Sequence, residues 1–309
     1  MNKDAKIFVA GHQGLVGSAL VRALTAAGYR DLILRTRAEL DLFDQPAVRT
    51  FFEKEKPEYA FLAAAKVGGI MANKTAPADF IRENLAIELN SIDAAYRNGV
   101  KKLLLLGSSC IYPRLAAQPI PESELLSGPL EETNRAYAIA KIAGIELCQS
   151  YNKQYDTNYI SVMPTNLYGP NDNFDLESSH VLPALLRKFH EAKKHDEPSV
   201  TVWGTGSALR EFLHVDDLAS ACLFLMNTYD ETDIVNIGTG EDLSIKELTG
   251  SIRSIVGYKG EIVWDTTKPD GTPRKLLDVS KLHALGWHHQ IPLMEGLKTT
   301  YEWYCTTHE

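Results

Sequence analysis

The chain has 309 residues, of which 44% are apolar and 23% are charged, and its net charge is −8 at neutral pH. This composition is typical of a globular protein with one sizeable core and a smaller appended lobe. The negative charge, with no basic stripe to offset it, argues against nucleic-acid binding. No segment reaches the roughly 18 continuous apolar residues of a membrane span, so we expect no membrane association.

The amino terminus and the cysteines indicate the compartment. Residues 1–6 lead directly into an apolar run, which leaves no room for a signal peptide. Cys110, Cys148, Cys222 and Cys305 are scattered without the paired spacing of a disulfide framework or a metal site. We therefore expect a cytoplasmic protein with reduced thiols and no metal.

The first 35 residues carry the pattern of a nucleotide-binding unit. A strand-like run at 6–10 leads into the turn Gly11-His-Gln-Gly14-Leu-Val-Gly17, and an apolar helical pattern follows up to Ala27. The glycines permit a tight turn and a close backbone approach, so the amino end of the helix can bind a pyrophosphate with its free N–H groups. A second strand follows at 32–35. This order predicts a dinucleotide-binding site.

The end of the second strand indicates which dinucleotide is bound. An acidic residue there would accept the ribose 2′-hydroxyl of NAD, but the sequence has Arg35-Thr-Arg37, whose guanidiniums can bind a phosphate. This favours NADP(H) over NAD(H). The alternative is a solvated basic pair on a loop, and Glu39 or Asp41 would weaken the preference if either turned inward.

The order of elements predicts the fold. Strand-like runs at 6–10, 32–35, 59–65, 103–107 and 159–164 alternate with helical patterns, as in a doubly wound parallel Rossmann sheet of the α/β class. The pattern then becomes mixed, with a helix around 181–191 and short strands at 200–203 and 262–264. We expect an NADP-binding domain over 1–167, to which 212–240 returns, and a smaller α/β substrate lobe over most of 168–309.

A candidate proton-transfer site combines a helix with a strand end. In Tyr137-Ala-Ile-Ala-Lys141 the phenol and the ammonium lie one turn apart on one helical face, where the cation favours the phenolate. Ser108 and Cys110 directly follow the strand at 103–107, at the edge where ligands bind in open α/β sheets. Such a tyrosine and lysine pair also occurs by chance on amphipathic helices. A lone cysteine such as Cys110 is ordinarily a small buried apolar residue.

A second polar cluster lies in the second half of the chain. His214, Asp216 and Asp217 could suggest a metal or acid–base site. We interpret them instead as the capped start of a helix, with the acids at its positive end.

Longer motifs resemble the extended short-chain dehydrogenase/reductases. They are AAAKVGGI at 63–70, GSSCIYP at 107–113, YAIAKIAG at 137–144, MPTNLYGP at 163–170, REFLHVDD at 210–217 and KPDGTPR at 268–274. Within that family they are similar to the branch that converts GDP-4-keto-6-deoxy-D-mannose to GDP-L-fucose. The resemblance implies an NADPH-dependent oxidoreductase with epimerase activity, which epimerises carbons 3 and 5 and then reduces the ketone at carbon 4. It also implies a homodimer that pairs helices flanking the sheet.

The resemblance assigns roles to individual residues. Ser108, Tyr137 and Lys141 would catalyse reduction, while Cys110 and His180 would exchange protons during epimerisation. The cofactor-binding residues would be Gly11, His12, Gln13, Gly14, Leu15, Val16, Gly17, Arg37, Asp41, Leu42, Leu106, Gly107, Lys141, Pro164, Thr165, Asn166, Leu167 and His180. The substrate-binding residues would be Lys188, Trp203, Arg210 and Asp270.

Several of these assignments have ordinary alternatives. His180 could simply begin a helix, and Asn166 could be a turn residue. Lys188 could lie on a solvated helix face, and Trp203 could belong to the core of the lobe. Gln13 departs from the family, which commonly has an arginine there. We therefore expect a weaker preference for NADPH, carried by Arg37 and in part by Arg35.

Two other functions remain open from the sequence. One is a sugar-nucleotide 4-epimerase or 4,6-dehydratase of the same superfamily, against which Cys110 and His180 argue. The other is a non-catalytic NADP-binding module, which the joint presence of Ser108, Tyr137 and Lys141 makes a poorer explanation.

Overall fold

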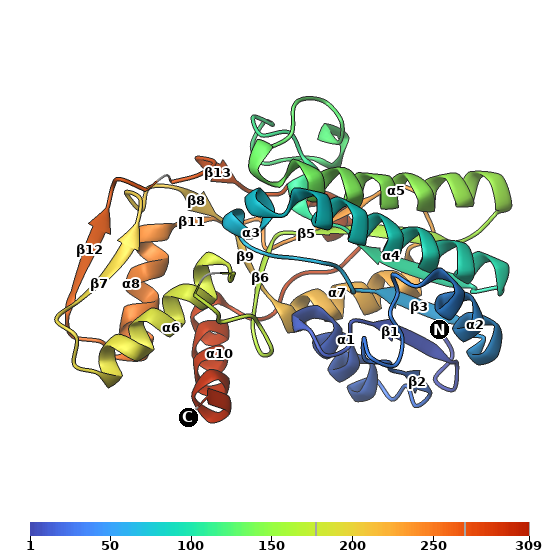
Figure 1. Ribbon diagram of the computed structural model, residues 1–309, viewed down its shortest axis with the longest axis horizontal. Helices are drawn as coiled ribbons and strands as arrows, with labels where there is room; N and C mark the ends of the chain where they lie inside the picture. Colours follow the sequence, from blue (N-terminus) through green and yellow to red (C-terminus); the bar gives the residue numbers. More distant parts are fainter. Residues whose placement is uncertain (177, 269, 309) are drawn as a thin grey trace.

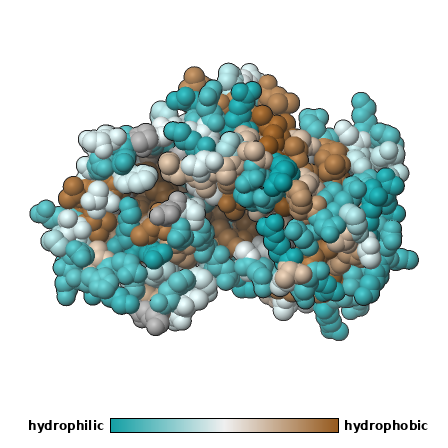
Figure 2. All heavy atoms as spheres, in the orientation of Figure 1, coloured by the Kyte–Doolittle hydropathy of each residue, from teal (hydrophilic) through white to brown (hydrophobic). Residues whose placement is uncertain are grey.

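The computed structural model describes residues 1–176, 178–268 and 270–308. Glu177, and Pro269 of the motif at 268–274, lie outside the described residues. Figure 1 shows a larger lobe, built on one sheet, and a smaller lobe that carries most of the second half of the chain. Figure 2 shows that the surface is hollowed between them. In the described part of the chain, no helix is long and apolar enough to cross a membrane.

The larger lobe contains six parallel strands in the order β10-β5-β4-β3-β1-β2. Their bounds are β1 (Ile7–Ala10), β2 (Leu32–Ile33), β3 (Tyr59–Leu62), β4 (Lys102–Leu106), β5 (Tyr159–Pro164) and β10 (Val235–Ile237). The predicted doubly wound parallel sheet is confirmed, although β2 and β3 end earlier than expected. Strand order reverses at β1, so the crevice beyond the carboxyl ends of β1 and β3 is the ligand position typical of such sheets.

Helices cover both faces of this sheet (Figure 1). One face packs against α2 (Gln45–Glu55), α4 (Pro77–Arg97) and α5 (Arg135–Tyr155), and the other against α1 (Leu15–Ala26), α7 (Val215–Thr228) and α9 (Ser280–Ala284). Strand β1 shows the division, because Phe8 contributes to the first core and Ile7 to the second. All four residues of β1 are buried, which explains its continuous apolar sequence.

The smaller lobe is built around a separate core. It contains α6 (Val181–Lys194), α8 (Ile245–Val256) and α10 (Leu293–His308), the paired strands β7 (Ser199–Trp203) and β12 (Glu261–Asp265), and β8 (Leu209–Arg210) between β11 (Leu243–Ser244) and β13 (Arg274–Lys275). The predicted helix at 181–191 and strands at 200–203 and 262–264 are confirmed. Ser244 and Glu247 form a capping box that fixes the start of α8.

Two short strands join the lobes. Strands β6 (Asn166–Tyr168) and β9 (Phe212–His214) pair in parallel, and α7 follows β9 directly. The side chain of His214 accepts a hydrogen bond of 3.2 Å from the backbone N–H of Asp216. Asp216 and Asp217 lie in the first turn of α7. The interpretation of this cluster as a capped helix start is therefore confirmed.

Candidate active site

The turn after β1 is shaped for close approach by an anion. A side chain at Gly17 would place its Cβ 2.0 Å from the carbonyl oxygen of Gly11, so only glycine fits there. Helix α1 begins after Gly14, and no side chain caps its first N–H groups. These groups, at the positive end of a 12-residue helix, can bind a pyrophosphate. Among the described residues, the buried Nδ1 of His12 beside this turn has no hydrogen-bond partner.

The two arginines after β2, Arg35 and Arg37, differ in their exposure and in their ion pairs. Nη2 of Arg35 lies 2.9 Å from Oε1 of Glu55, so this guanidinium is already paired. Arg37 is 74% exposed and lies 3.7 Å from Asp41. Glu39 accepts hydrogen bonds within its own turn, from Thr36. Arg37, the more exposed of the two arginines, is thus the residue placed to meet a 2′-phosphate, with Asp41 and, at 3.9 Å, Glu83 as its competitors.

The end of β4 brings a hydroxyl and a thiol to the same edge as α5. Ser108 caps the short turn 109–111, and its Oγ accepts a hydrogen bond of 3.2 Å from the backbone N–H of Cys110. The same hydroxyl lies near enough to the Tyr137 phenol that it acts to lower the pKa of that phenol. Nζ of Lys141 lies 6.0 Å from the centre of the Tyr137 ring. The structure therefore places Ser108, Cys110, Tyr137 and Lys141 together.

Lys141 is buried in an ion pair with Glu88 of the neighbouring helix α4. Its Nζ donates a hydrogen bond of 2.9 Å to the carbonyl oxygen of Leu106 and lies 3.0 Å from Oε1 of Glu88. Both charged side chains are only 2% exposed. Burial acts to lower the pKa of Lys141, but the Glu88 carboxylate raises it overall, so the ammonium stays charged.

Gly144 makes room for this pair. A Cβ at position 144 would lie 2.5 Å from Oε2 of Glu88. The signal for Glu88 was present in the sequence: Asn84, Glu88 and Ile92 lie at four-residue spacing on the buried face of α4. A carboxylate on a buried helical stripe requires a partner, and Lys141 on the neighbouring helix α5 supplies it.

We predict that Glu88→Gln lowers the free energy of unfolding by about 3 kcal/mol, because it leaves the Lys141 ammonium buried without a counter-charge. Urea denaturation measures this loss. Glu83→Gln, on the same helix, is the matched control, since Glu83 pairs with the more exposed Lys66 at 2.8 Å. That pair should contribute less than about 1 kcal/mol. Equal losses in the two variants would contradict a special role for Glu88.

The phenol of Tyr137 is held in its protonated form. Burial raises its pKa, while the nearby Lys141 charge and the hydrogen bond with Ser108 oppose this rise. Because the net direction is upward, the phenol carries its proton at neutral pH. It can donate that proton to an oxygen that gains negative charge, and Lys141 then stabilises the phenolate.

Cys110 and His180 lie near a common positive charge. Burial acts to raise the pKa of Cys110, but the Lys275 ammonium and hydrogen bonds from neighbouring side chains outweigh it, so the pKa is lowered. His180 is exposed at the amino end of α6. The protein atoms around the ring still reduce its solvation, and this effect, together with the Lys275 charge, lowers the pKa of His180. The Cys110 thiol therefore ionises more readily than an ordinary cysteine, and His180 is a neutral imidazole at neutral pH.

The predicted substrate-binding residues lie on the smaller lobe. Trp203 is 56% exposed, so it is not a core residue, and Nζ of Lys188 lies 5.8 Å from the centre of its ring. Asp270 accepts hydrogen bonds from the backbone N–H and hydroxyl of Thr205, at 2.7 and 2.8 Å. Burial lowers the pKa of Arg210, and the nearby Asp270 carboxylate opposes this effect. The Arg210 guanidinium and the Asp270 carboxylate are therefore close neighbours.

The remaining predicted cofactor residues lie at strand ends. Leu106 ends β4 and Gly107 follows it, and Pro164 ends β5. Asn166 lies in β6 rather than in a turn, and its Nδ2 donates a hydrogen bond of 2.7 Å to the carbonyl oxygen of Glu211. Thr165 donates to the same oxygen at 3.4 Å. Leu42 is buried in the core between the sheet and helices α2, α4 and α5.

Comparison with known proteins agrees with the geometry of this site. The NAD dependent epimerase/dehydratase family matches residues 7–238. The chain belongs to this family. It is 64% identical to a putative GDP-L-fucose synthase 2 of Arabidopsis thaliana, over 98% of this chain and 93% of the relative. It is 58% identical to the GDP-L-fucose synthase of Escherichia coli, over 97% and 96%.

A solved structure extends the likeness to the fold. The GDP-mannoheptose C4 reductase of Campylobacter jejuni, determined with NADP bound, is 45% identical, with a TM-score of 0.92 and 99% of each chain covered. The resemblance predicted from the sequence motifs is therefore confirmed over nearly the whole chain.

Proposed function

We propose that this chain converts GDP-4-keto-6-deoxy-D-mannose to GDP-L-fucose, by epimerising carbons 3 and 5 and then reducing the ketone at carbon 4 with NADPH. One observation carries the proposal: a thiol of lowered pKa and a protonated, buried phenol lie at the same strand end, beside Ser108 and Lys141. The first suits removal of a carbon-bound proton, and the second suits protonation of a carbonyl oxygen. The high identity to GDP-L-fucose synthases supports the same assignment.

Epimerisation uses the ketone as an electron sink. The Cys110 thiolate removes a proton from the carbon next to the carbonyl, and the electron pair of the C–H bond moves onto the carbonyl oxygen. Hydrogen bonds from Ser108 and Tyr137 stabilise the resulting enolate. His180 returns a proton to the opposite face of the ring, which inverts the carbon. Because its pKa is lowered, the His180 imidazole is neutral at rest; it takes up a proton from solvent before this step and then gives that proton up readily.

Reduction uses the same carbonyl position. The bound cofactor supplies a hydride to carbon 4. Tyr137 gives its proton to the carbonyl oxygen, and Lys141 stabilises the phenolate that remains. Because Tyr137 and Ser108 already hold this oxygen during epimerisation, the substrate need not leave between the two reactions.

The cofactor is NADP(H), and the turn after β1 fits it. The uncapped amino end of α1 would hold the pyrophosphate, and Arg37, in the loop after β2, would meet the 2′-phosphate. Gln13 is exposed in the turn after β1 and can donate only neutral hydrogen bonds. The individual cofactor and substrate contacts remain part of the proposal.

We predict that Arg37→Ala reduces the preference for NADPH over NADH by about tenfold, because one charge-assisted contact to the 2′-phosphate is lost. Gln13→Arg should increase the preference. Steady-state kinetics with each cofactor measures both changes. Arg35→Ala is the control, since its partner Glu55 keeps it from the phosphate. A loss of preference only in Arg35→Ala would overturn this assignment.

The assembly, compartment and lobe boundaries are also proposals. Leu89, Ile139 and Tyr155 are exposed on the adjacent helices α4 and α5, and Figure 2 shows brown patches in this region, which supports a homodimer through these helices. Sedimentation velocity would distinguish a dimer from a monomer.

The four cysteines are free thiols, as expected of a protein in the reducing cytoplasm. Cell fractionation would test the proposed cytoplasmic location. We keep the division into a cofactor domain over 1–167, with 212–240, and a substrate lobe over 168–309.

A further inference from the structure

Lys275 reaches the active site from the opposite lobe. It ends the short strand β13, which pairs with β8, and the chain that follows crosses to the loop at 118–120. The backbone N–H of Leu276 donates to Oε1 of Gln118 at 2.8 Å, and that of Leu277 donates to the buried Glu211 carboxylate at 3.1 Å. These hydrogen bonds fix the backbone on the carboxyl side of Lys275 and so fix where its side chain begins.

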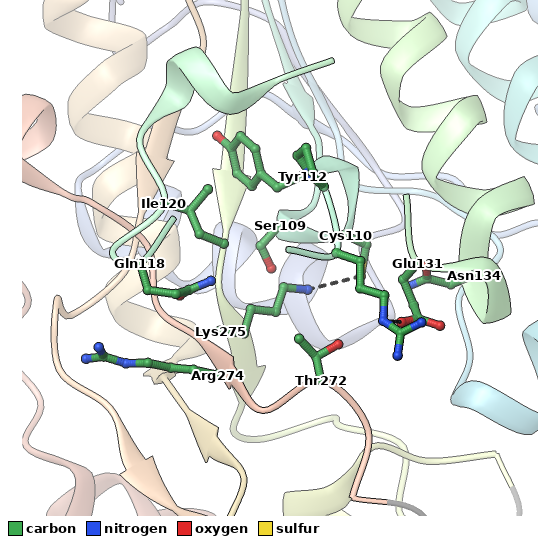
Figure 3. A pocket seen from close by; sticks show the side chains of 12 residues that line it. Ser109, Cys110, Tyr112, Gln118, Ile120, Glu131, Asn134, Thr272, Arg274 and Lys275 are labelled. Atoms are coloured by element: carbon green, nitrogen blue, oxygen red, sulfur yellow. Dashed lines mark hydrogen bonds and ion pairs between the residues drawn. The ribbon is translucent and has the colours of Figure 1, made fainter. Parts of the chain in front are cut away.

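The side chain of Lys275 contacts the sulfur of Cys110. Nζ lies 3.4 Å from Sγ, and Figure 3 shows the two side chains pointing toward each other across the pocket. The neighbouring Arg274 points away, and it pairs with Asp242 at 2.5 Å. Alternate residues of β13 therefore face opposite sides, with only the lysine directed at the thiol.

The other charges around this pocket are already paired. Arg114 lies 3.3 Å from Glu131, both on the pocket wall. Within the described residues, Lys275 forms no ion pair with a carboxylate, and its contact is the Cys110 sulfur. An ammonium whose contact inside a pocket is a thiol stabilises the ionised form of that thiol.

We infer that Lys275 is a positioning residue of the epimerisation, which holds the Cys110 sulfur as a thiolate facing the substrate. The inference rests on the proposed function for the role of the thiolate. In the step itself, the substrate C–H bond breaks, its electron pair moves onto the ketone oxygen and its proton bonds to Sγ. Lys275 keeps its own protons throughout and acts only through the charge of the sulfur.

Several groups that titrate or carry charge face Cys110 besides Lys275. Tyr137 on α5 is protonated at neutral pH, and the neutral Asn134 side chain, on the pocket wall, acts to lower the pKa of the thiol. His180, at the start of α6, is close enough to Lys275 to respond to its charge. None of these three carries a positive charge at neutral pH, so the ammonium is the dominant stabiliser of the thiolate.

The test is the pH dependence of alkylation of Cys110 by iodoacetamide, in a Cys305→Ser background. Cys148 and Cys222 are fully buried, so Cys110 is then the accessible thiol. Lys275→Met should raise the thiol pKa by about one to three units, because an opposite charge in contact is removed. At neutral pH the alkylation rate should fall about tenfold for each unit. Lys275→Arg should restore most of the rate.

Controls distinguish a change in the thiol pKa from loss of folding and from loss of turnover. Arg274→Met removes the adjacent charge that points away, and its alkylation profile should match that of the parent. NADPH binding by each variant reports that it is folded, and Lys275→Gln replaces any variant that is not. An unchanged profile in a folded Lys275→Met or Lys275→Gln variant would overturn the inference. Since alkylation needs no turnover, a shifted profile without GDP-L-fucose formation would overturn the proposed function instead.

Discussion

Tyr137→Phe is expected to abolish reduction of the ketone while leaving exchange of the ring protons detectable. The phenol is buried and protonated, and within the described active site it is the group placed to give a proton to the carbonyl oxygen. Removing a general acid costs about a hundredfold to ten-thousandfold in rate, and we expect the upper end here. Exchange survives because Cys110 and His180 are unchanged.

The two activities can be measured separately. Consumption of NADPH reports reduction, and incorporation of deuterium from heavy water into carbons 3 and 5 reports exchange. Tyr151→Phe is a matched control on the same helix, since Tyr151 bonds to Asp93 at 3.0 Å, far along α5 from the site. Loss of both activities in Tyr137→Phe would contradict the assignment of reduction to Tyr137 and of proton exchange to Cys110 and His180.

Cys110→Ser is expected to suppress deuterium exchange by about a hundredfold or more, because a serine hydroxyl is a far weaker acid than this thiol, whose pKa is lowered. Binding of NADPH should be retained, since the nucleotide turn and Arg37 lie elsewhere. Cys305→Ser, on helix α10 of the smaller lobe, is the matched control and should exchange at the parent rate. Undiminished exchange in Cys110→Ser would remove this residue from the mechanism.

The sequence predicted the central sheet well because its strands are buried on both faces. The run at 159–164 is buried throughout, is apolar except for Ser161, and coincides with β5, since no solvent-facing position interrupts it. The strand predicted over 32–35 was less accurate. Leu34 and Arg35 lie beyond the paired residues Leu32 and Ile33, and Arg35 instead pairs with Glu55. Pairing partners far along the chain decide where a strand ends, and the local sequence does not contain them.

The sequence also predicted which residues would gather at the end of β4. Ser108 and Cys110 follow a buried strand, and Tyr137 and Lys141 share a helical face, so local rules suffice. Glu88 and Lys275 needed the tertiary structure. Glu88 meets Lys141 only because α4 packs on α5, and Lys275 meets Cys110 only because the smaller lobe returns across the pocket. No spacing in the sequence links positions 165 residues apart.

The most direct test of the account is turnover of GDP-4-keto-6-deoxy-D-mannose by the purified protein. Consumption of reduced nicotinamide would be compared for NADPH and NADH, and the sugar product would be identified. The account predicts stoichiometric oxidation of NADPH, a preference for NADPH over NADH, and GDP-L-fucose as the product. Absence of turnover with either cofactor, or a reduced sugar with carbons 3 and 5 unchanged, would contradict it.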